Sequence, residues 1–195
     1  ALEALGRCSG VIGTIGAGRI DTLRPLSLTT PDAISLQAEL AQMVHAGLDS
    51  VCIEISSHAL DQARVRGVDI DAAVFTNLSR DHLDYHGSMD AYAASKFLLF
   101  QDHGVRTAII NTSDPYGAEF VQAGIPAKVW TYGPDNLANV YPEISEAFLT
   151  GIRLRLATPA GCISFKVSLL GRLNVMNLVA VVTALLALHY SPAAI

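Results

Sequence analysis

Short apolar runs alternate with longer helical segments along most of the chain. Five runs have the length and β-branched content of buried strands, at residues 11–15, 51–55, 72–75, 106–111 and 127–132. Segments with helical spacing or capping residues follow several of them, at residues 29–47, 88–100, 114–124 and 171–189. Such alternation favours a parallel sheet with right-handed crossovers. The pattern therefore predicts an α/β fold, with a mostly parallel sheet flanked by helices.

The pattern changes between residues 133 and 168. Residues 152–156 and 162–168 alternate in polarity on either side of the turn sequence Thr158-Pro159-Ala160-Gly161. This arrangement predicts a small antiparallel hairpin appended to the main sheet. Residues 16–30 contain glycine, arginine and proline without a helical period, and they are predicted to form a loop.

The helix after that loop has a recognisable start. Thr29-Thr30-Pro31-Asp32 offers a threonine cap, a proline near the first helical position and an acid in the first turn. An apolar stripe then runs to the predicted stop at Gly47, through Ile34, Leu40, Met43 and Val44. Capping by itself is enough to explain one of the two threonines.

The segment richest in reactive side chains follows the run 72–75. Residues 76–87 read Thr-Asn-Leu-Ser-Arg-Asp-His-Leu-Asp-Tyr-His-Gly, and in open α/β sheets ligands bind at the carboxyl ends of strands. Ser88 then resembles a helix N-cap with Asp90 in the first turn. Lys96 stands in the apolar run 91–100, so it is not expected on an open polar face. A lysine that only snorkels to solvent is the alternative.

Two further features suggest cation chemistry. His82 and His86 have the spacing of a zinc pair, but Gly87 follows at once and no third soft ligand is evident, so the zinc interpretation is weak. Glu54 is a single acid near the end of the apolar run 51–55. A buried carboxylate is costly unless it is paired or binds a cation. The alternative is a residue at a sheet edge that faces solvent.

Composition narrows the class of protein. With 195 residues the chain is long enough for one domain with a sizeable core. Its net charge of −5 and pI near 5.6, without any run of Lys or Arg, disfavour nucleic acid as a partner. The longest apolar run, 178–188, is too short to span a bilayer, so no membrane segment is expected. Three widely spaced cysteines, Cys8, Cys52 and Cys162, predict buried free thiols in a reducing, cytoplasmic setting.

Two long motifs resemble one family. Residues 76–87, followed by Tyr92-Ala93-Ala94-Ser95-Lys96, are similar to the central domain of the Mur ligases, and within them to the MurE type. Residues 54–65, Glu-Ile-Ser-Ser-His-Ala-Leu-Asp-Gln-Ala-Arg-Val, resemble the substrate-binding segment of the same family. The resemblance covers nearly the whole chain and is weakest between residues 115 and 160. It implies that residues 1–195 are a central ATP-binding domain with a fold like that of P-loop NTPases.

The resemblance also implies roles for individual residues. It makes Glu54 a ligand of one magnesium ion, and makes His82 and a carbamylated Lys96 the catalytic residues that serve a second ion. It assigns the adenine of ATP to Asn174 and Asn177, although Asn174 could equally be a helix cap. It assigns the UDP-sugar-peptide to five residues, Thr29, Thr30, Ser56, Gln62 and Arg64; the fork of an arginine suits phosphate or carboxylate.

The implied reaction is ATP-dependent amide formation in peptidoglycan precursor synthesis. The γ-phosphate passes to the free carboxylate of UDP-N-acetylmuramoyl-L-Ala-D-Glu, and the amine of a diamino acid, meso-diaminopimelate or lysine, attacks the acyl-phosphate. A cytoplasmic monomer is expected.

The sequence lacks the phosphate-binding loop that this interpretation requires. The sequence contains neither G-x-x-x-x-G-K-[ST] nor a Gly-Lys-Thr, and Gly13-Thr14-Ile15-Gly16 lacks the necessary lysine. We therefore expect a domain truncated at both ends, without its P-loop and without the N- and C-terminal domains, and inactive alone. Two alternatives are another ligase of the superfamily, such as a folylpolyglutamate synthetase, and a folded fragment without catalytic function.

Overall fold

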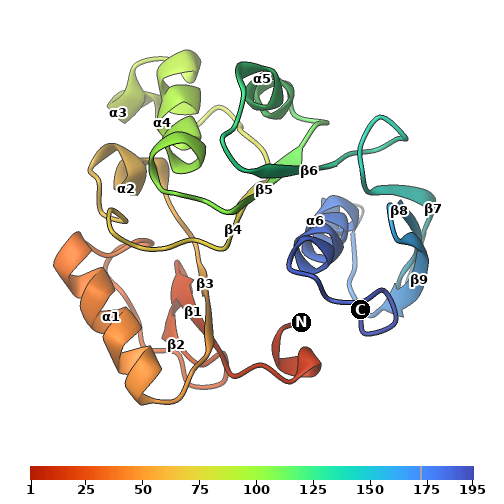
Figure 1. The fold of residues 1–195 in the computed structure, drawn as a ribbon, viewed down its shortest axis with the longest axis horizontal. Coiled ribbons are helices and arrows are strands. Elements are labelled where there is room, and N and C mark those ends of the chain that lie inside the picture. Colours follow the sequence, from red (N-terminus) through yellow and green to blue (C-terminus); the bar gives the residue numbers. More distant parts are fainter. Residues whose placement is uncertain (172) are drawn as a thin grey trace. The chain divides into compact units, whose positions relative to one another are not determined.

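The structure is a computed structural model that describes residues 1–171 and 173–195. The chain forms two compact units (Figure 1). The first unit contains residues 1–69 and 82–103, and the second contains residues 70–81 and 104–195. The chain thus passes from the first unit into the second and back before it completes the second.

The first unit is built on a three-stranded sheet in the order β2-β1-β3. Strand β1 (Ser9–Gly13) pairs in parallel with β3 (Ser50–Ile53) and antiparallel with β2 (Gly16–Gly18). A 3-10 turn, η1 (Glu3–Leu5), precedes the sheet. The helices of this unit are α1 (Ala33–His45), α2 (Ser57–Asp61), α3 (Leu83–His86) and α4 (Met89–Asp102). Helix α4 packs against α2 and α3.

Strand β2 was not predicted, because residues 16–30 were expected to be loop throughout. Gly16 and Gly18 have φ values of +126° and +127°, which only glycine adopts readily. A Cβ on Gly16 would lie 2.5 Å from the carbonyl oxygen of Arg24. This close backbone approach allows a short hairpin that side-chain alternation cannot reveal.

Helix α1 differs from its prediction at the cap and in its buried face. Asp32 is the N-cap, and its Oδ1 accepts hydrogen bonds from Ile34 N and Ser35 N at 3.1 Å, so neither threonine caps the helix. Ile34 is 84% exposed and Val44 70% exposed. Met43 of the predicted stripe is buried, and it shares the buried face with Leu36 and with Glu39, which is paired to Arg24 at 2.7 Å. Met43 packs directly over Gly10 of β1, which decides which face of the helix is covered.

The second unit contains the predicted parallel sheet. Its order is β4-β5-β6, from β4 (Ala72–Phe75), β5 (Thr107–Asn111) and β6 (Lys128–Tyr132). All five residues of β5, the central strand, are buried. Helix α5 (Pro115–Ala123) contacts β5 and has Asp114 as its N-cap, which agrees with the helix predicted over residues 114–124. The match with predicted strands 72–75, 106–111 and 127–132 is within one residue at each end.

A second sheet in this unit is larger than predicted. Strands β7 (Tyr141–Phe148), β8 (Gly151–Thr158) and β9 (Gly161–Val167) form an antiparallel sheet in that order. The predicted hairpin is β8 and β9; it belongs to this separate sheet, to which β7 adds a third strand. Strand β7 lacks the expected alternation because six of its eight residues are exposed.

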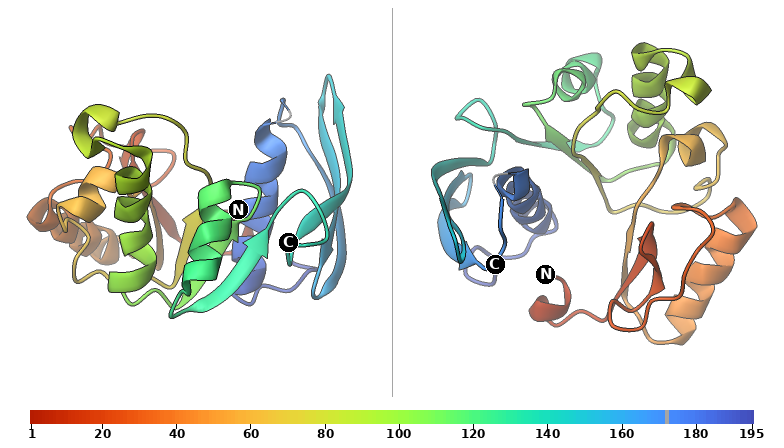
Figure 2. Two further views of the ribbon diagram at one scale, coloured as in Figure 1. Left: turned by 90° about the horizontal axis from the view of Figure 1, so that it is seen from above. Right: turned by 180° about the vertical axis from the view of Figure 1, so that it is seen from behind.

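Helix α6 (Leu173–Ala187) lies between the two sheets of the second unit (Figures 1 and 2). Its buried residues join side chains from both sheets in one core, which includes Ile109, Tyr132, Leu154 and Val179. The predicted helix 171–189 is therefore confirmed as a core helix, while Arg172 falls outside the described residues. Among the helices of the described residues, none is long and apolar enough to cross a membrane.

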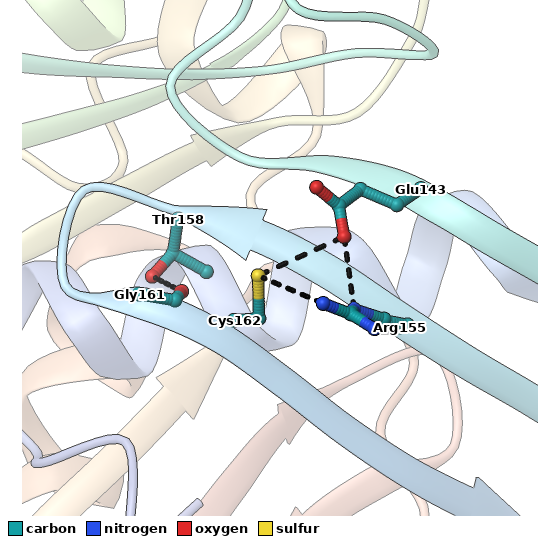
Figure 3. A network of polar contacts seen from close by, with 5 residues as sticks. All are labelled: Glu143, Arg155, Thr158, Gly161 and Cys162. Carbon is teal, nitrogen blue, oxygen red and sulfur yellow. Dashed lines mark hydrogen bonds and ion pairs between the residues drawn. The ribbon is translucent and has the colours of Figure 1, made fainter.

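The three cysteines are free, as predicted, but they are exposed and not buried. Cys52 stands on the exposed position of β3. Cys162 begins the outward-facing side of β9, where its Sγ lies 3.8 Å from Arg155 Nη2 and 3.7 Å from Glu143 Oε2 (Figure 3). A strand that is covered on one face alone places every second residue in solvent, so apolar surroundings in sequence did not ensure burial.

Candidate active site

Lys96 lies on the third turn of α4 and is half-buried, as its apolar neighbours predict. Its Nζ is 6.0 Å from the centre of the Tyr92 ring, one helical turn earlier. Burial lowers the pKa of the Lys96 ammonium, and the negative charge of Glu54 opposes this shift.

Glu54 directly follows β3, and its side chain is exposed. The expectation of a buried, lone carboxylate inside the strand is therefore wrong, because β3 ends at Ile53. The carboxylate is held by the β1–β2 turn: Oε2 accepts hydrogen bonds from Thr14 N at 3.0 Å and from Thr14 Oγ1 at 2.9 Å. An exposed carboxylate with one oxygen fixed by two donors can bind a cation without a large desolvation cost.

His82 stands immediately before α3 in the left-handed conformation, with φ +54° and ψ +25°. Residues other than glycine seldom adopt this conformation, and when they do it is often at functional sites. The His82 ring lies 5.8 Å from the Tyr92 ring and 5.1 Å from the His58 ring, measured between centroids. His82 and Lys96 thus both contact Tyr92, which brings two of the predicted metal ligands to one part of the first unit.

The donor chemistry of these residues suits magnesium better than zinc. Within the described part of the chain, no group of three His, Cys, Asp or Glu side chains could hold a metal ion. Magnesium keeps several waters and needs only one or two carboxylates from the protein. Glu54 offers one such carboxylate. An imidazole is a softer donor, so His82 suits a water-bridged contact.

The predicted substrate residues form a connected group in the same unit. Arg64 donates from Nη1 to the Thr30 carbonyl at 2.9 Å and from Nη2 to Gln62 Oε1 at 2.6 Å. Thr30 is fully buried; its Oγ1 donates to the Glu54 carbonyl at 2.8 Å and accepts from Ser56 N at 3.0 Å. Ser56 is the N-cap of α2, with Oγ accepting from Ala59 N. One hydrogen-bonded network therefore joins these residues to the backbone of Glu54.

Sequence reasoning missed the residues that hold α3 in place. His86 stacks on Tyr92 with ring centroids 5.0 Å apart, and its two ring nitrogens lie 2.9 Å from Ser57 Oγ and 3.4 Å from Ser95 Oγ. Burial is the main cause that lowers the pKa of His86, which favours its neutral form. Tyr85 OH donates to Asp61 at 2.6 Å. The Tyr-His pair before Gly87 was the available signal, but its partners are more than twenty positions away or on another helix.

Asn174 and Asn177 lie in the first turns of α6, in the second unit. Asn174 Nδ2 donates to the Leu170 carbonyl at 2.7 Å, and Asn177 Nδ2 donates to Asn174 Oδ1 at 3.3 Å. A helix cap would accept a hydrogen bond from a backbone N–H, whereas Asn174 lies inside the helix and donates to a carbonyl. The cap alternative for Asn174 is therefore wrong.

Comparison with known proteins places this site in a family. Residues 1–185 match the family described as the Mur ligase middle domain. The chain belongs to this family. It is 45% identical over 192 residues to the UDP-N-acetylmuramoyl-L-alanyl-D-glutamate–2,6-diaminopimelate ligase of Ectopseudomonas mendocina, and 45% identical over 191 residues to the ligase of the same name from Pseudomonas aeruginosa. Each match covers 97% of this chain and 39% of the relative.

Solved structures agree with the sequence matches. A structure of a UDP-N-acetylmuramoyl-L-alanyl-D-glutamate–2,6-diaminopimelate ligase superposes with a TM-score of 0.90 at 35% identity, over 98% of this chain and 40% of that one. The apo form of L. casei FPGS superposes with a TM-score of 0.74 at 16% identity, over 99% of this chain and 55% of that one, which indicates a shared fold alone. The chain spans about two fifths of the length of these ligases.

Proposed function

We propose that residues 1–195 are the central domain of a longer ATP-dependent ligase of peptidoglycan precursor synthesis. The proposed reaction joins a diamino acid to UDP-N-acetylmuramoyl-L-Ala-D-Glu. The observation that carries this proposal is that His82 and Lys96 both lie against the Tyr92 ring, in the same compact unit as Glu54 and the hydrogen-bonded network of Thr30 and Arg64. Identity of 45% to two ligases that act on this substrate supports the same reaction for the full-length protein.

The reaction has two steps in this proposal. The substrate carboxylate first attacks the γ-phosphorus of ATP, which forms an acyl-phosphate and releases ADP. The amine then attacks the acyl carbon, inorganic phosphate leaves, and the amine loses a proton. Magnesium neutralises charge on the phosphates during transfer. Glu54 would bind that cation, and Arg64, with the network through Thr30 and Gln62, would orient the substrate.

Lys96 is proposed to act as a carbamate. The ammonium first loses one proton; the neutral amine then attacks carbon dioxide, forms an N–C bond and releases a second proton, so that the cation becomes an anion. Burial favours this step because it lowers the pKa of the Lys96 amine and so enlarges its neutral fraction. The carbamate would then supply an oxygen donor to a second magnesium ion, which His82 would also serve, and that ion would offset its negative charge.

The proposed acceptor is 2,6-diaminopimelate, because it appears in the names of the two ligases at 45% identity. The folylpolyglutamate synthetase alternative is less well supported, since its likeness to this chain is one of fold at 16% identity. We further propose that the protein is a monomer that acts in the cytoplasm, where ATP and the nucleotide-linked substrate are available.

Replacement of Lys96 tests the proposed function. In the full-length protein, Lys96→Ala should lower the ligation rate by at least about 10²-fold, the usual loss for a group that stabilises transition-state charge. A short carboxylic acid should restore part of the rate in Lys96→Ala by filling the gap with an oxygen donor. Lys96→Arg should not be restored, because it keeps the positive charge and the bulk. Product formation is measured with saturating ATP and magnesium.

Lys166→Ala is the matched control, since Lys166 is an exposed lysine on β9. It should leave the rate unchanged. A signal from ¹³C-labelled carbon dioxide attached to the protein, present in wild type and Lys166→Ala but lost in Lys96→Ala, would identify the carbamate directly. Full activity of Lys96→Ala without added acid would refute the proposed role.

A further inference from the structure

The turn between β1 and β2 approaches the Glu54 side chain unusually closely. Gly13 and Gly16 are paired in the hairpin, with Thr14 and Ile15 as its two-residue loop. A Cβ on Gly13 would lie 2.9 Å from Glu54 Oε2 and 3.0 Å from Glu54 Cβ. The absent side chain at Gly13 therefore lets the Glu54 side chain rest against the backbone of the turn, within reach of both donors of Thr14.

Thr14 donates two hydrogen bonds to a single oxygen of the Glu54 carboxylate. Its backbone N–H and its hydroxyl both donate to Glu54 Oε2, at 3.0 and 2.9 Å. Two donors on one oxygen restrict the rotation of the carboxylate and do not use Oε1. Hydrogen bonds to a charged acceptor are stronger than those between neutral groups, so an exposed pair of them can still hold an orientation.

The single hydroxyl hydrogen of Thr14 determines the direction of its hydrogen bond with Thr29. A threonine hydroxyl has one hydrogen, and Thr14 gives that hydrogen to Glu54. The 2.9 Å contact between Thr14 Oγ1 and Thr29 Oγ1 must then have Thr29 as donor. A directed chain results, from Thr29 through Thr14 to Glu54.

We propose that Thr14 is a positioning residue that orients Glu54 for the cation and couples it to Thr29, a residue on the proposed substrate side. This inference rests on the proposed function, in which Glu54 binds magnesium. Groups that orient a metal ligand commonly change metal affinity 10- to 100-fold when they are removed. A chain of hydrogen bonds between two ligand sites also allows each ligand to change the affinity for the other.

The test compares Thr14→Val with Thr14→Ser in the full-length protein. Valine keeps the shape and the backbone N–H but removes the hydroxyl, whereas serine keeps the hydroxyl. Binding of Mn²⁺, which prefers the same oxygen donors as Mg²⁺, is followed by its electron paramagnetic resonance. Thr14→Val should weaken Mn²⁺ binding by about ten-fold or more, and Thr14→Ser should stay close to wild type. In ligation assays Thr14→Val should raise the magnesium requirement while kcat at saturating magnesium is largely kept.

The coupling between cation binding and substrate binding is measured separately. In the wild type, bound Mn²⁺ should change the affinity for the UDP-sugar-dipeptide, and in Thr14→Val this change should shrink towards none. Glu54→Gln serves as the reference variant. If Glu54→Gln weakens Mn²⁺ binding but Thr14→Val does not, the role of Thr14 is refuted and the proposed function stands. If Glu54→Gln binds Mn²⁺ as well as the wild type does, the magnesium role of Glu54 fails, and the role of Thr14 fails with it.

Discussion

Asn174 and Asn177, the two residues predicted to bind adenine, form a hydrogen-bonded pair near the start of α6. Each carries an amide with both a donor and an acceptor, which is what the edge of adenine requires. One donor of Asn174 is used on the Leu170 carbonyl, and its oxygen accepts from Asn177. Asn177 is exposed, whereas Asn174 is half-buried. The pair is therefore pre-oriented, with Asn177 as its outer member.

Replacing these asparagines should affect ATP alone. In the full-length protein, Asn174→Ala and Asn177→Ala should each raise the KM for ATP about ten-fold or more, since a paired amide–adenine contact is worth about 1–3 kcal/mol. The KM for the UDP-sugar substrate should not change, and steady-state kinetics with each substrate varied in turn measures both values. Asn136→Ala, at an exposed loop residue, is the control. If the ATP dependence is the same in all variants, the two asparagines serve only the start of the helix.

At the scale of elements, polar side chains at the end of one strand or the start of one helix hydrogen-bond to the loop that follows a neighbouring strand. Asn111 at the end of β5 donates from Nδ2 to the Thr76 carbonyl at 2.6 Å, and Asp114 at the start of α5 accepts from Leu78 N at 2.8 Å. These bonds hold the first residues after β4 within the second unit. In the first unit, the Thr30 hydroxyl donates to the Glu54 carbonyl, just after β3, and accepts from Ser56 N, just before α2. It thereby holds the junction between these two elements.

Thr30→Val should therefore destabilise the protein. The variant keeps the shape of the side chain but leaves the Glu54 carbonyl and the Ser56 N–H without this buried partner, which costs about 1–3 kcal/mol. Urea unfolding of the chain, followed by circular dichroism, measures the free energy of unfolding. Thr22→Val is the matched control, because Thr22 is exposed and its hydroxyl bonds only the adjacent Asp21. A Thr30→Val variant as stable as Thr22→Val would show that the Thr30 hydroxyl does not stabilise this junction.

At the scale of the whole molecule, the predicted roles are divided between two compact units. Glu54, His82, Lys96 and the residues predicted to bind the UDP-sugar-peptide belong to the first unit, and the two asparagines predicted to bind adenine belong to the second. The chain contains no Gly-Lys-Ser or Gly-Lys-Thr to bind the phosphates of ATP. ATP hydrolysis thus requires more than these 195 residues in our proposal.

We predict that the 195-residue chain alone neither hydrolyses ATP nor forms the amide. Backbone donors and a lysine of a phosphate-binding loop are needed to position the γ-phosphate. ADP release from the purified chain, measured in a coupled assay with excess magnesium, should equal that of its Glu54→Ala variant. The full-length protein should release ADP when the UDP-sugar substrate is present. ADP release from the chain clearly above that of Glu54→Ala would contradict this prediction.

The order of elements could be derived from the sequence, because hydrophobic period and capping residues are local properties. Strands β4, β5 and β6 and helices α4, α5 and α6 follow from runs of apolar residues and from Ser88, Asp114 and Gly124 at helix ends. Strands β2 and β7 could not be derived this way. The first depends on glycine conformations and a close backbone approach, and the second has too few buried residues to produce an alternating pattern.

The sequence by itself determined the family, the parallel sheet and the types of residue at the candidate site. Only the tertiary structure decided how those residues are held. The contacts of Glu54 with Thr14 and of Arg64 with Thr30 join positions 40 and 34 apart. No local pattern encodes such distances, because they depend on which strands pair and which helix face is covered. The exposed cysteines and the Asp32 cap were missed for the same reason: burial and hydrogen bonding are properties of the folded chain, whereas the sequence shows only which residues could provide them.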